Sequence, residues 1–140
     1  DATFGCVFSD GQRVSGMTLL ILAMVKGHQG LAEALLQRGA DVSLQTSDGT
    51  TALMVAATYG REKLVELALR HGADINQRCG SNSSSTPLIR AAFFGRPAVV
   101  LRLLRAGADM TLRDVDGKTA LQWAKERGHA ECVEAFRTHI

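Results

Sequence analysis

The chain has 140 residues, of which 46% are hydrophobic and 5% aromatic, and its formal net charge at pH 7 is +2. This length and composition predict one globular domain, and the small net charge gives no reason to expect nucleic acid as a partner. The longest apolar run, 19–25, has seven residues, whereas a membrane-spanning helix needs about 20, so we expect no membrane span.

The N-terminal residues 1–14 stand apart from the rest of the sequence. They contain Phe4, Val7 and Phe8 near an Asp-Gly turn dipeptide, a pattern that predicts an extended arm or hairpin. The next predicted helix, over 19–25, is apolar on all sides, and such a helix must be buried on most of them. We expect the arm to cover it; an upstream repeat and a partner protein are the alternatives.

Three markers recur along the rest of the chain at nearly constant spacing. A glycine recurs at intervals of 33, 35 and 33 residues, and Gly-Ala-Asp and Thr-x-Leu follow the same period. The glycine is Gly27, Gly60, Gly95 and Gly128. Gly-Ala-Asp occurs at 39–41, 72–74 and 107–109, and Thr-x-Leu begins at Thr51, Thr86 and Thr119. Self-similarity at this period predicts stacked supersecondary units rather than one closed core.

Each unit is predicted to contain two helices separated by a glycine. In residues 48–81, Thr51 follows an Asp-Gly turn and is placed to cap the first helix through its hydroxyl. Gly60 ends that helix, because glycine readily adopts the left-handed conformation at a helix C-terminus. A second helix follows with its apolar residues at helical spacing, and it ends at Gly72.

The markers combine into the pattern D-G-x-T-[PA]-L-x-x-A-A-x-x-G-H-x-x-x-V-x-x-L-L-x-x-G-A-D-x-N, which resembles the ankyrin repeat over about residues 15–140. The resemblance implies an all-α solenoid of stacked helix-turn-helix units joined by β-turn or hairpin loops. After the arm 1–14, its repeats are expected at about 15–47, 48–81, 82–115 and 116–140. The family's usual histidine is replaced by Ile21, Met54, Ile89 and Gln122. We expect weaker local hydrogen bonding there and an unchanged fold.

The segment 79–85 contains the two extra residues that lengthen one repeat interval, and it is rich in serine. It predicts a longer loop tip between the second and third repeats. Insertions in repeat arrays map to loops, often on the binding face. A tolerated surface loop without a task is equally consistent with the sequence.

In ankyrin repeats, recognition falls mainly on the turn tips and on the first, inner helix of each unit. Carried onto this chain, the resemblance implies a partner-binding surface made of Thr58, Tyr59, Arg78, Arg90, Phe93, Phe94, Arg113, Val115, Lys118 and Trp123. Tyr59, Phe93 and Phe94 stand out, because the fold needs no apolar side chain at these positions and aromatic residues often anchor interfaces. The alternative is that Phe93 or Phe94 fills a gap between neighbouring repeats.

The three cysteines, Cys6, Cys79 and Cys132, are far apart and form no C-x-x-C motif. The spacing needed for a zinc or thioredoxin-like site is therefore missing. A sparse, odd number of cysteines favours reduced thiols in a reducing intracellular compartment, such as the cytosol, the nucleus or an organelle matrix. Cys132 falls on an apolar helical face, where we expect it to be buried.

The sequence contains no recognisable catalytic, metal-binding or phosphate-binding motif, so we predict no enzyme and no cofactor. His28 and His129 fall at the family's Gly-His turn, where the ring usually bonds the backbone. The leading hypothesis is a protein-interaction module, monomeric when alone. The alternative is a structural subunit, permanently docked in a larger complex through its apolar first repeat and N-terminal arm.

Charge leaves a further choice open. Residues 61–113 hold nine Lys and Arg residues against four acidic ones. This excess predicts either a solvated helical face or a basic surface that meets an acidic partner protein. An RNA- or anion-binding surface on the same stretch is the weakest of the hypotheses, because the net charge of the whole chain is small.

Overall fold

The computed structural model describes residues 6–7, 13–14, 16–43, 45, 49–79 and 84–139. Two short antiparallel strands, with Cys6 opposite Val14, precede a stack of helices. The elements are, in chain order, β1 (Cys6–Val7), β2 (Arg13–Val14), α1 (Gly16–Lys26), α2 (Gln29–Gln37), α3 (Ala52–Thr58), α4 (Glu62–Arg70), α5 (Pro87–Phe93), α6 (Pro97–Arg105), α7 (Ala120–Glu126) and α8 (Ala130–His139).

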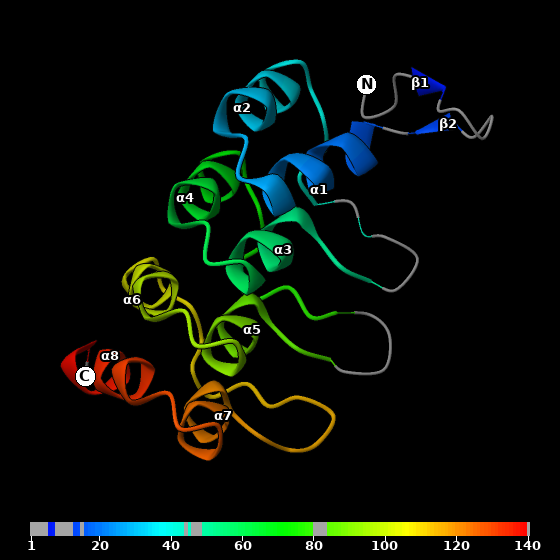
Figure 1. Cartoon of the computed structure of the whole chain (residues 1–140). Helices are drawn as coiled ribbons and strands as arrows, with labels where there is room; N and C mark the ends of the chain where they lie inside the picture. Colours follow the sequence, from blue (N-terminus) through cyan, green and yellow to red (C-terminus); the bar gives the residue numbers. More distant parts are fainter. Residues whose placement is uncertain are drawn as a thin grey trace.

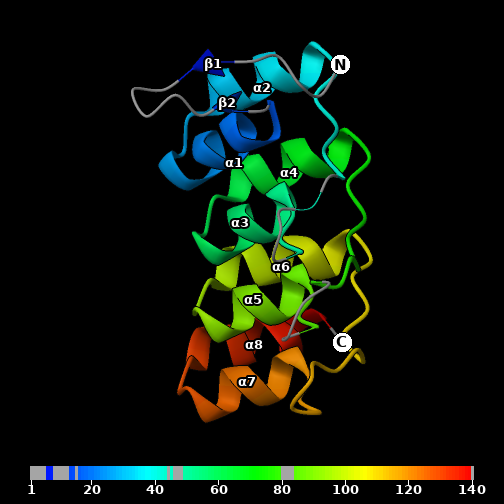
Figure 2. The ribbon, with the colours of Figure 1, turned by 90° about the vertical axis from the view of Figure 1, so that its right-hand side faces the viewer.

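The described helices form two layers. Figure 1 shows α1, α3, α5 and α7 in one layer, with the loop between α6 and α7 projecting beyond them, and the even-numbered helices in the other. Figure 2 shows the pairs stacked in chain order along one axis. We call the odd-numbered helices the inner helices and the even-numbered ones the outer helices. Each packs against the next of its own layer as well as against its partner. The predicted all-α stack is confirmed.

Three of the inner helices begin at a threonine cap. The hydroxyl oxygens of Thr51, Thr86 and Thr119 accept hydrogen bonds from the backbone nitrogens of Met54, Ile89 and Gln122, over 3.3, 3.2 and 3.3 Å. Each cap satisfies one of the backbone donors that a helix N-terminus leaves free. At Thr119 the cap is reciprocal, because Gln122 Oε1 accepts from the Thr119 backbone nitrogen at 2.8 Å. Gln122 therefore supplies a hydrogen bond at a position where the family usually has histidine.

A row of side-chain hydrogen bonds joins each helix pair to the one before it. The bonds run from Arg61 Nη2 to the Val25 oxygen (2.9 Å), from Arg96 Nε to the Thr58 oxygen (3.0 Å), and between His129 Nε2 and the Phe93 oxygen (3.0 Å). We call these three bonds the carbonyl ladder. The predicted hydrogen bond from the turn histidine to the backbone is confirmed for His129. The exposed ring of His28 makes no such bond to a described residue.

The carbonyl ladder depends on the recurring glycines. Gly27, Gly60 and Gly95 have φ angles of 74°, 69° and 69°, a region that glycine enters without steric cost. A Cβ atom at these positions would also come within 3.1, 2.9 and 2.7 Å of the side chain that arrives from the next helix pair. Each of these glycines therefore both turns the chain and leaves room for the ladder.

The core runs through the whole stack and consists mainly of small and aliphatic side chains. The inner helices are rich in fully buried alanines, such as Ala56 and Ala91, which allow neighbouring helices to approach closely. The outer helices contribute buried leucine and valine. In α4 the predicted inward residues 64, 65, 67 and 68 are buried, but Leu69 is only half-buried because it lies at a surface groove.

The first helix pair is covered less completely than the others. In α1, Leu20, Ala23 and Met24 are buried, as predicted, while Leu22 is 41% exposed. In α2, Leu31 is 46% exposed, whereas the residues at the matching positions of later repeats, 64, 99 and 132, are all buried. Strand β2 contacts α1; Phe4 and Phe8, which were expected to cover this helix, lie outside the described residues.

The carbonyl ladder predicts that substitution by alanine destabilises the chain more at Gly95 than at Gly128. Gly95→Ala and Gly128→Ala both place alanine at positive φ, which costs about 1–2 kcal/mol. Only Gly95→Ala also forces its Cβ against His129, because no atom lies within 4 Å of a Cβ at Gly128. We expect Gly95→Ala to lose about 1 kcal/mol more in urea unfolding, from the broken hydrogen bond. Equal losses for the two variants would contradict this role of the ladder.

The burial of the Cys132 thiol leads us to expect a loss of folding stability at alkaline pH. Its burial, with a smaller effect of Glu131, raises the pKa of the thiol from 9.0 to about 11. As pH rises, the unfolded chain ionises first, so the stability that is present below pH 9 is lost between about pH 9 and 11, by about 2 kcal/mol. Urea unfolding across this window should fall more steeply for the natural chain than for Cys132→Ala; parallel curves would refute the assignment.

Candidate functional site

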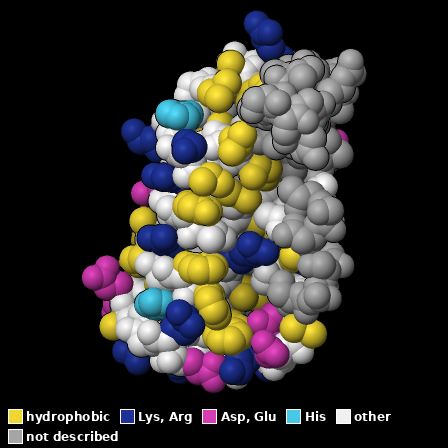
Figure 3. Space-filling view, turned by 45° about the vertical axis from the view of Figure 1, so that its right-hand side comes forward, with side chains coloured by type: hydrophobic (Ala, Val, Ile, Leu, Met, Phe, Trp, Pro, Cys, Tyr) yellow, Lys and Arg dark blue, Asp and Glu magenta, His cyan; other side chains and the backbone are white. Residues whose placement is uncertain are grey.

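The inner helices and the loops beside them form one face of the molecule, which we call the inner face. Figure 3 shows a band of hydrophobic side chains along it, parallel to the stack, with most of the Lys and Arg side chains on the left of the band. Tyr59 and Phe94 occupy matching positions directly after α3 and α5, and each is 45% exposed. Val115, on the loop before α7, is 65% exposed. Exposed apolar side chains of this size make the inner face a candidate for an interaction surface.

Three aromatic rings gather at the C-terminal end of α5 and on α7. The Phe93 ring meets that of Phe94 edge-to-face, with centroids 5.0 Å apart and planes at 66°. On its other side it meets the Trp123 ring in the same manner, at 4.9 Å and 69°. We call these three residues the aromatic cluster. Phe93 is half-buried and links α5 to α7, which favours the gap-filling alternative for this residue. Phe94 lies at the exposed edge of the cluster.

Polar contacts fix the orientation of Trp123. Its indole Nε1 donates to Asp114 Oδ2 at 2.6 Å, and Asp114 Oδ1 accepts from the backbone nitrogens of Asp116 and Lys118 at 3.0 and 3.1 Å. Lys118 Nζ lies 4.5 Å from the centroid of the indole and pairs with Glu126 at 2.8 Å. The hydrogen bond to Glu126 raises the pKa of Lys118. The loop that contains Asp114 is thus attached to α7 through Trp123.

The aromatic cluster forms a wall of a groove of about 460 Å³. Its lining residues are Ser85, Ile89, Arg90, Phe93, Phe94, Asp114, Asp116 and Trp123. Arg90 is held in place at one side, because Nε donates to Ser85 Oγ at 3.1 Å and Nη2 lies 3.7 Å from Cys79 Sγ. We call this the inner groove. It combines an apolar wall with the charged side chains of Arg90, Asp114 and Asp116.

The structure brings only part of the predicted surface together. Arg90, Phe93, Phe94 and Trp123 line the inner groove, and Lys118 packs on the indole. The other predicted residues, Thr58, Tyr59, Arg78, Arg113 and Val115, are outside its lining.

Three of those outlying residues make contacts within the chain. Thr58 Oγ1 bonds the Met54 oxygen of its own helix at 2.8 Å. Arg78 Nη1 donates to the Arg113 oxygen at 2.6 Å, and Arg113 Nη1 donates to the Gly117 oxygen at 2.8 Å. The two arginines therefore brace neighbouring loops. Of the predicted loop tip at 79–85, residues 80–83 lie outside the described residues.

Comparison with known protein families agrees with the repeat pattern. The family model described as ankyrin repeats (3 copies) matches residues 5–79 and 88–139. The chain belongs to the ankyrin repeat family. The interruption between the two matched ranges falls on the serine-rich insertion. A comparison with curated proteins found no match.

Membership of the ankyrin family indicates a general class of function, the binding of other proteins. Ankyrin repeats are generally protein–protein interaction modules, and the family is typically non-catalytic. Over the residues that the structure describes, no cluster of His, Cys, Asp and Glu is arranged to hold a metal ion. Within the same residues, every helix is too short or too polar to cross a bilayer.

Five residues that line the inner groove or contact the aromatic cluster were not among the ten predicted residues: Ser85, Ile89, Asp114, Asp116 and Arg127. Arg127 places its guanidinium carbon 4.2 Å from the centroid of the Phe93 ring. It occupies the position of Phe94 one repeat later, so the repeat spacing could have identified it. Ile89 lines the groove beneath the rings. The role of Asp114 depends on how its loop folds back onto α7, and no pattern in the sequence indicates that.

The Asp114–Trp123 bond can be tested through the only tryptophan in the chain. Asp114→Ala removes the indole's acceptor and two backbone bonds of the loop, so we expect a red-shifted tryptophan emission and a loss of about 1–3 kcal/mol in unfolding. The matched control is Asp116→Ala, since no hydrogen bond of the Asp116 carboxylate is seen to a described residue. If both variants shift the emission equally, Asp114 does not position the indole.

Proposed function

We propose that this ankyrin repeat protein is a non-catalytic interaction module that binds a segment of a partner protein in the inner groove. One observation carries the proposal: Phe94 is exposed beside two rings that are already fixed in place. Aromatic side chains at the centre of an interface supply much of its binding energy. A rigid aromatic surface binds with a small loss of conformational entropy, because its side chains are ordered before the partner arrives.

The surface around the groove extends the proposed contact. Tyr59 is exposed at the matching position one repeat before Phe94, and Val115 is exposed on the loop before α7. We propose Phe94 as the anchor, with Tyr59 and Val115 as neighbouring contacts.

The proposed acidic character of the partner rests on fewer cations than the sequence suggested. Arg61 and Arg96 belong to the carbonyl ladder, and Arg78 and Arg113 brace loops. Arg127 is exposed and stacked on Phe93 at the edge of the cluster. We propose that it meets a carboxylate of the partner, close to the apolar side chain that Phe94 receives.

The proposal is tested by cross-linking and mass spectrometry of complexes captured from the native source. Phe94→Ala should reduce capture of the dominant partner by about tenfold or more, as expected for a central aromatic anchor. Leu31→Ala is the matched control, because Leu31 is similarly exposed but lies on the outer helix α2. Both variants should keep the melting curve of the natural chain. Unchanged capture by Phe94→Ala would refute the inner groove as the binding site.

A structural subunit that docks through its first repeat and N-terminal arm is the second candidate. The observation in its favour is the exposure of Leu31 at a position that is buried in every later repeat. A large partner lying against this end of the stack would cover it. In the same experiment, this function predicts the reverse result: Leu31→Ala loses the partner and Phe94→Ala keeps it.

A further inference from the structure

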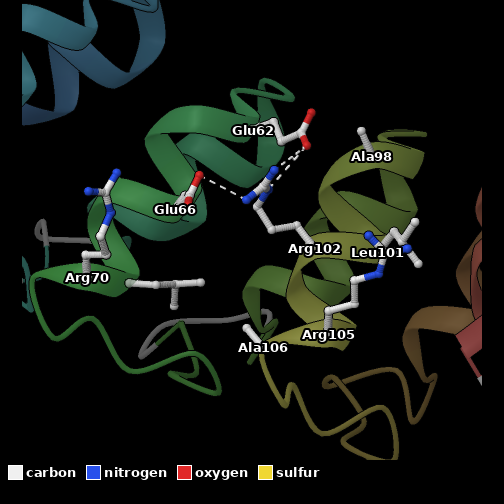
Figure 4. A pocket seen from close by; sticks show the side chains of 9 residues that line it. Glu62, Glu66, Arg70, Ala98, Leu101, Arg102, Arg105 and Ala106 are labelled. Carbon is white, nitrogen blue, oxygen red and sulfur yellow. Dashed lines mark hydrogen bonds and ion pairs between the residues drawn. The ribbon is translucent and has the colours of Figure 1, made fainter.

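The outer helices carry a second groove, on a different part of the molecule from the inner groove. It lies between α4 and α6, has a volume of about 540 Å³ and is shown in Figure 4. We call it the outer groove. Its apolar surface comes from Leu69 and Leu101, both half-buried, and from the exposed Ala98 and Ala106. The alanines leave space for the backbone of another helix to approach, and the leucines offer apolar area to it.

An ion-pair cluster occupies one end of the outer groove. Arg102 extends from α6 to α4, where its guanidinium lies 2.6 Å from Glu62 and 3.0 Å from Glu66 (Figure 4). The hydrogen bond to Glu62 raises the pKa of Arg102, with further contributions from the charges of both glutamates. Two carboxylates share one arginine, so this end of the groove keeps a net negative charge.

The other end of the outer groove is basic. Arg70 and Arg105 are the last residues of α4 and α6, and both are exposed. Neither makes an ion pair or hydrogen bond with the residues that the structure describes. Their charge is suited to the negative ends of their own helix dipoles, and their guanidinium groups remain available to an incoming carboxylate.

The direction of the two helices favours one orientation of an occupant. Both α4 and α6 run from the acidic end of the outer groove to its basic end. A helix lying antiparallel to them would place its N-terminus at Arg70 and Arg105. Acidic residues in its first turn would be stabilised by these arginines and by the positive end of its own dipole. Basic residues in its last turn would meet Glu62 and Glu66.

We propose that the outer groove binds an amphipathic helix of a partner protein, acidic in its first turn and basic in its last. The nine residues of α4 or α6 span about 13 Å, so contact is limited to about two and a half turns of the occupant. Its apolar residues would recur at i, i+3 or i+4, and i+7 to cover Leu69 and Leu101. A neighbouring hollow shares Ala98 and Leu101 and continues to α8, which extends the apolar surface beyond the groove itself.

A selection experiment on the full chain tests the proposal without knowledge of the natural partner. The probe is a phage-displayed library of helical peptides of about five turns with randomised surface positions. We expect enrichment of peptides with Asp or Glu in the first turn and apolar residues at the stated spacing. We would measure the affinity of the selected peptides for the chain by fluorescence anisotropy. It should fall about tenfold in Arg70→Glu/Arg105→Glu, because two charges are reversed. It should fall at least about tenfold in Leu101→Asp, which places a charge on the apolar surface.

Matched variants separate this groove from other surfaces. Lys63→Glu reverses one charge at an exposed position of α4 outside the groove lining, and Phe94→Ala alters the inner groove. Both should leave peptide affinity within about twofold of the natural chain. Changing the acidic residues of a selected peptide to lysine should restore its affinity for Arg70→Glu/Arg105→Glu, a rescue that a folding defect cannot produce.

Several results would overturn the proposal. These are a selection without enrichment, enriched peptides that lack an acidic first turn, and binding that Phe94→Ala abolishes. Sedimentation of the chain alone provides another: a dimer that Leu101→Asp dissociates would make a second copy, and not a partner helix, the occupant of the outer groove.

Discussion

The fold depends on the contact between a turn glycine and the side chain that arrives from the next repeat. At Gly27, Gly60 and Gly95 the missing Cβ leaves the space in which Arg61, Arg96 and His129 reach back to a backbone carbonyl. An unpaired carbonyl between two packed repeats would cost free energy, and the ladder removes that cost. It also sets the distance between neighbouring inner helices, and therefore the spacing of everything that those helices present.

The inner groove is built on the last of these contacts. The Phe93 carbonyl accepts the ladder bond of His129, while the Phe93 ring lies between Phe94 and Trp123. Phe93 thus connects the scaffold to the surface that we propose for binding. Exposed Phe94 is ordered by contacts that already exist in the free protein, which lowers the entropic cost of binding. In the outer groove no ladder bond ends on a lining residue. Its two walls, α4 and α6, are joined instead by the ion pairs of Arg102 with Glu62 and Glu66.

Much of the scaffold could be predicted from the sequence, because its determinants are local. The caps at Thr51, Thr86 and Thr119 and the turns at the recurring glycines depend on residues within a few positions of one another. The contacts of the candidate residues could be predicted less well: Arg78 and Arg113 donate to backbone oxygens of loops, and nothing in the sequence indicates the bond between Asp114 and Trp123. Those roles depend on how one loop meets the next repeat, a relation that repeat spacing does not encode.

The serine-rich insertion shows how far the scaffold and the loops are independent. It lengthens one repeat interval from 33 to 35 residues, yet the ladder bond across that boundary, from Arg96 Nε to the Thr58 oxygen, has the same length of 3.0 Å as the next one, between His129 and Phe93. The glycine turns on either side of the insertion keep the same conformation, since Gly60 and Gly95 both have a φ angle of 69°. Mutations can therefore lengthen, shorten or rewrite the tips in the course of evolution while the stack is inherited unchanged, so that new binding preferences can arise on an old frame.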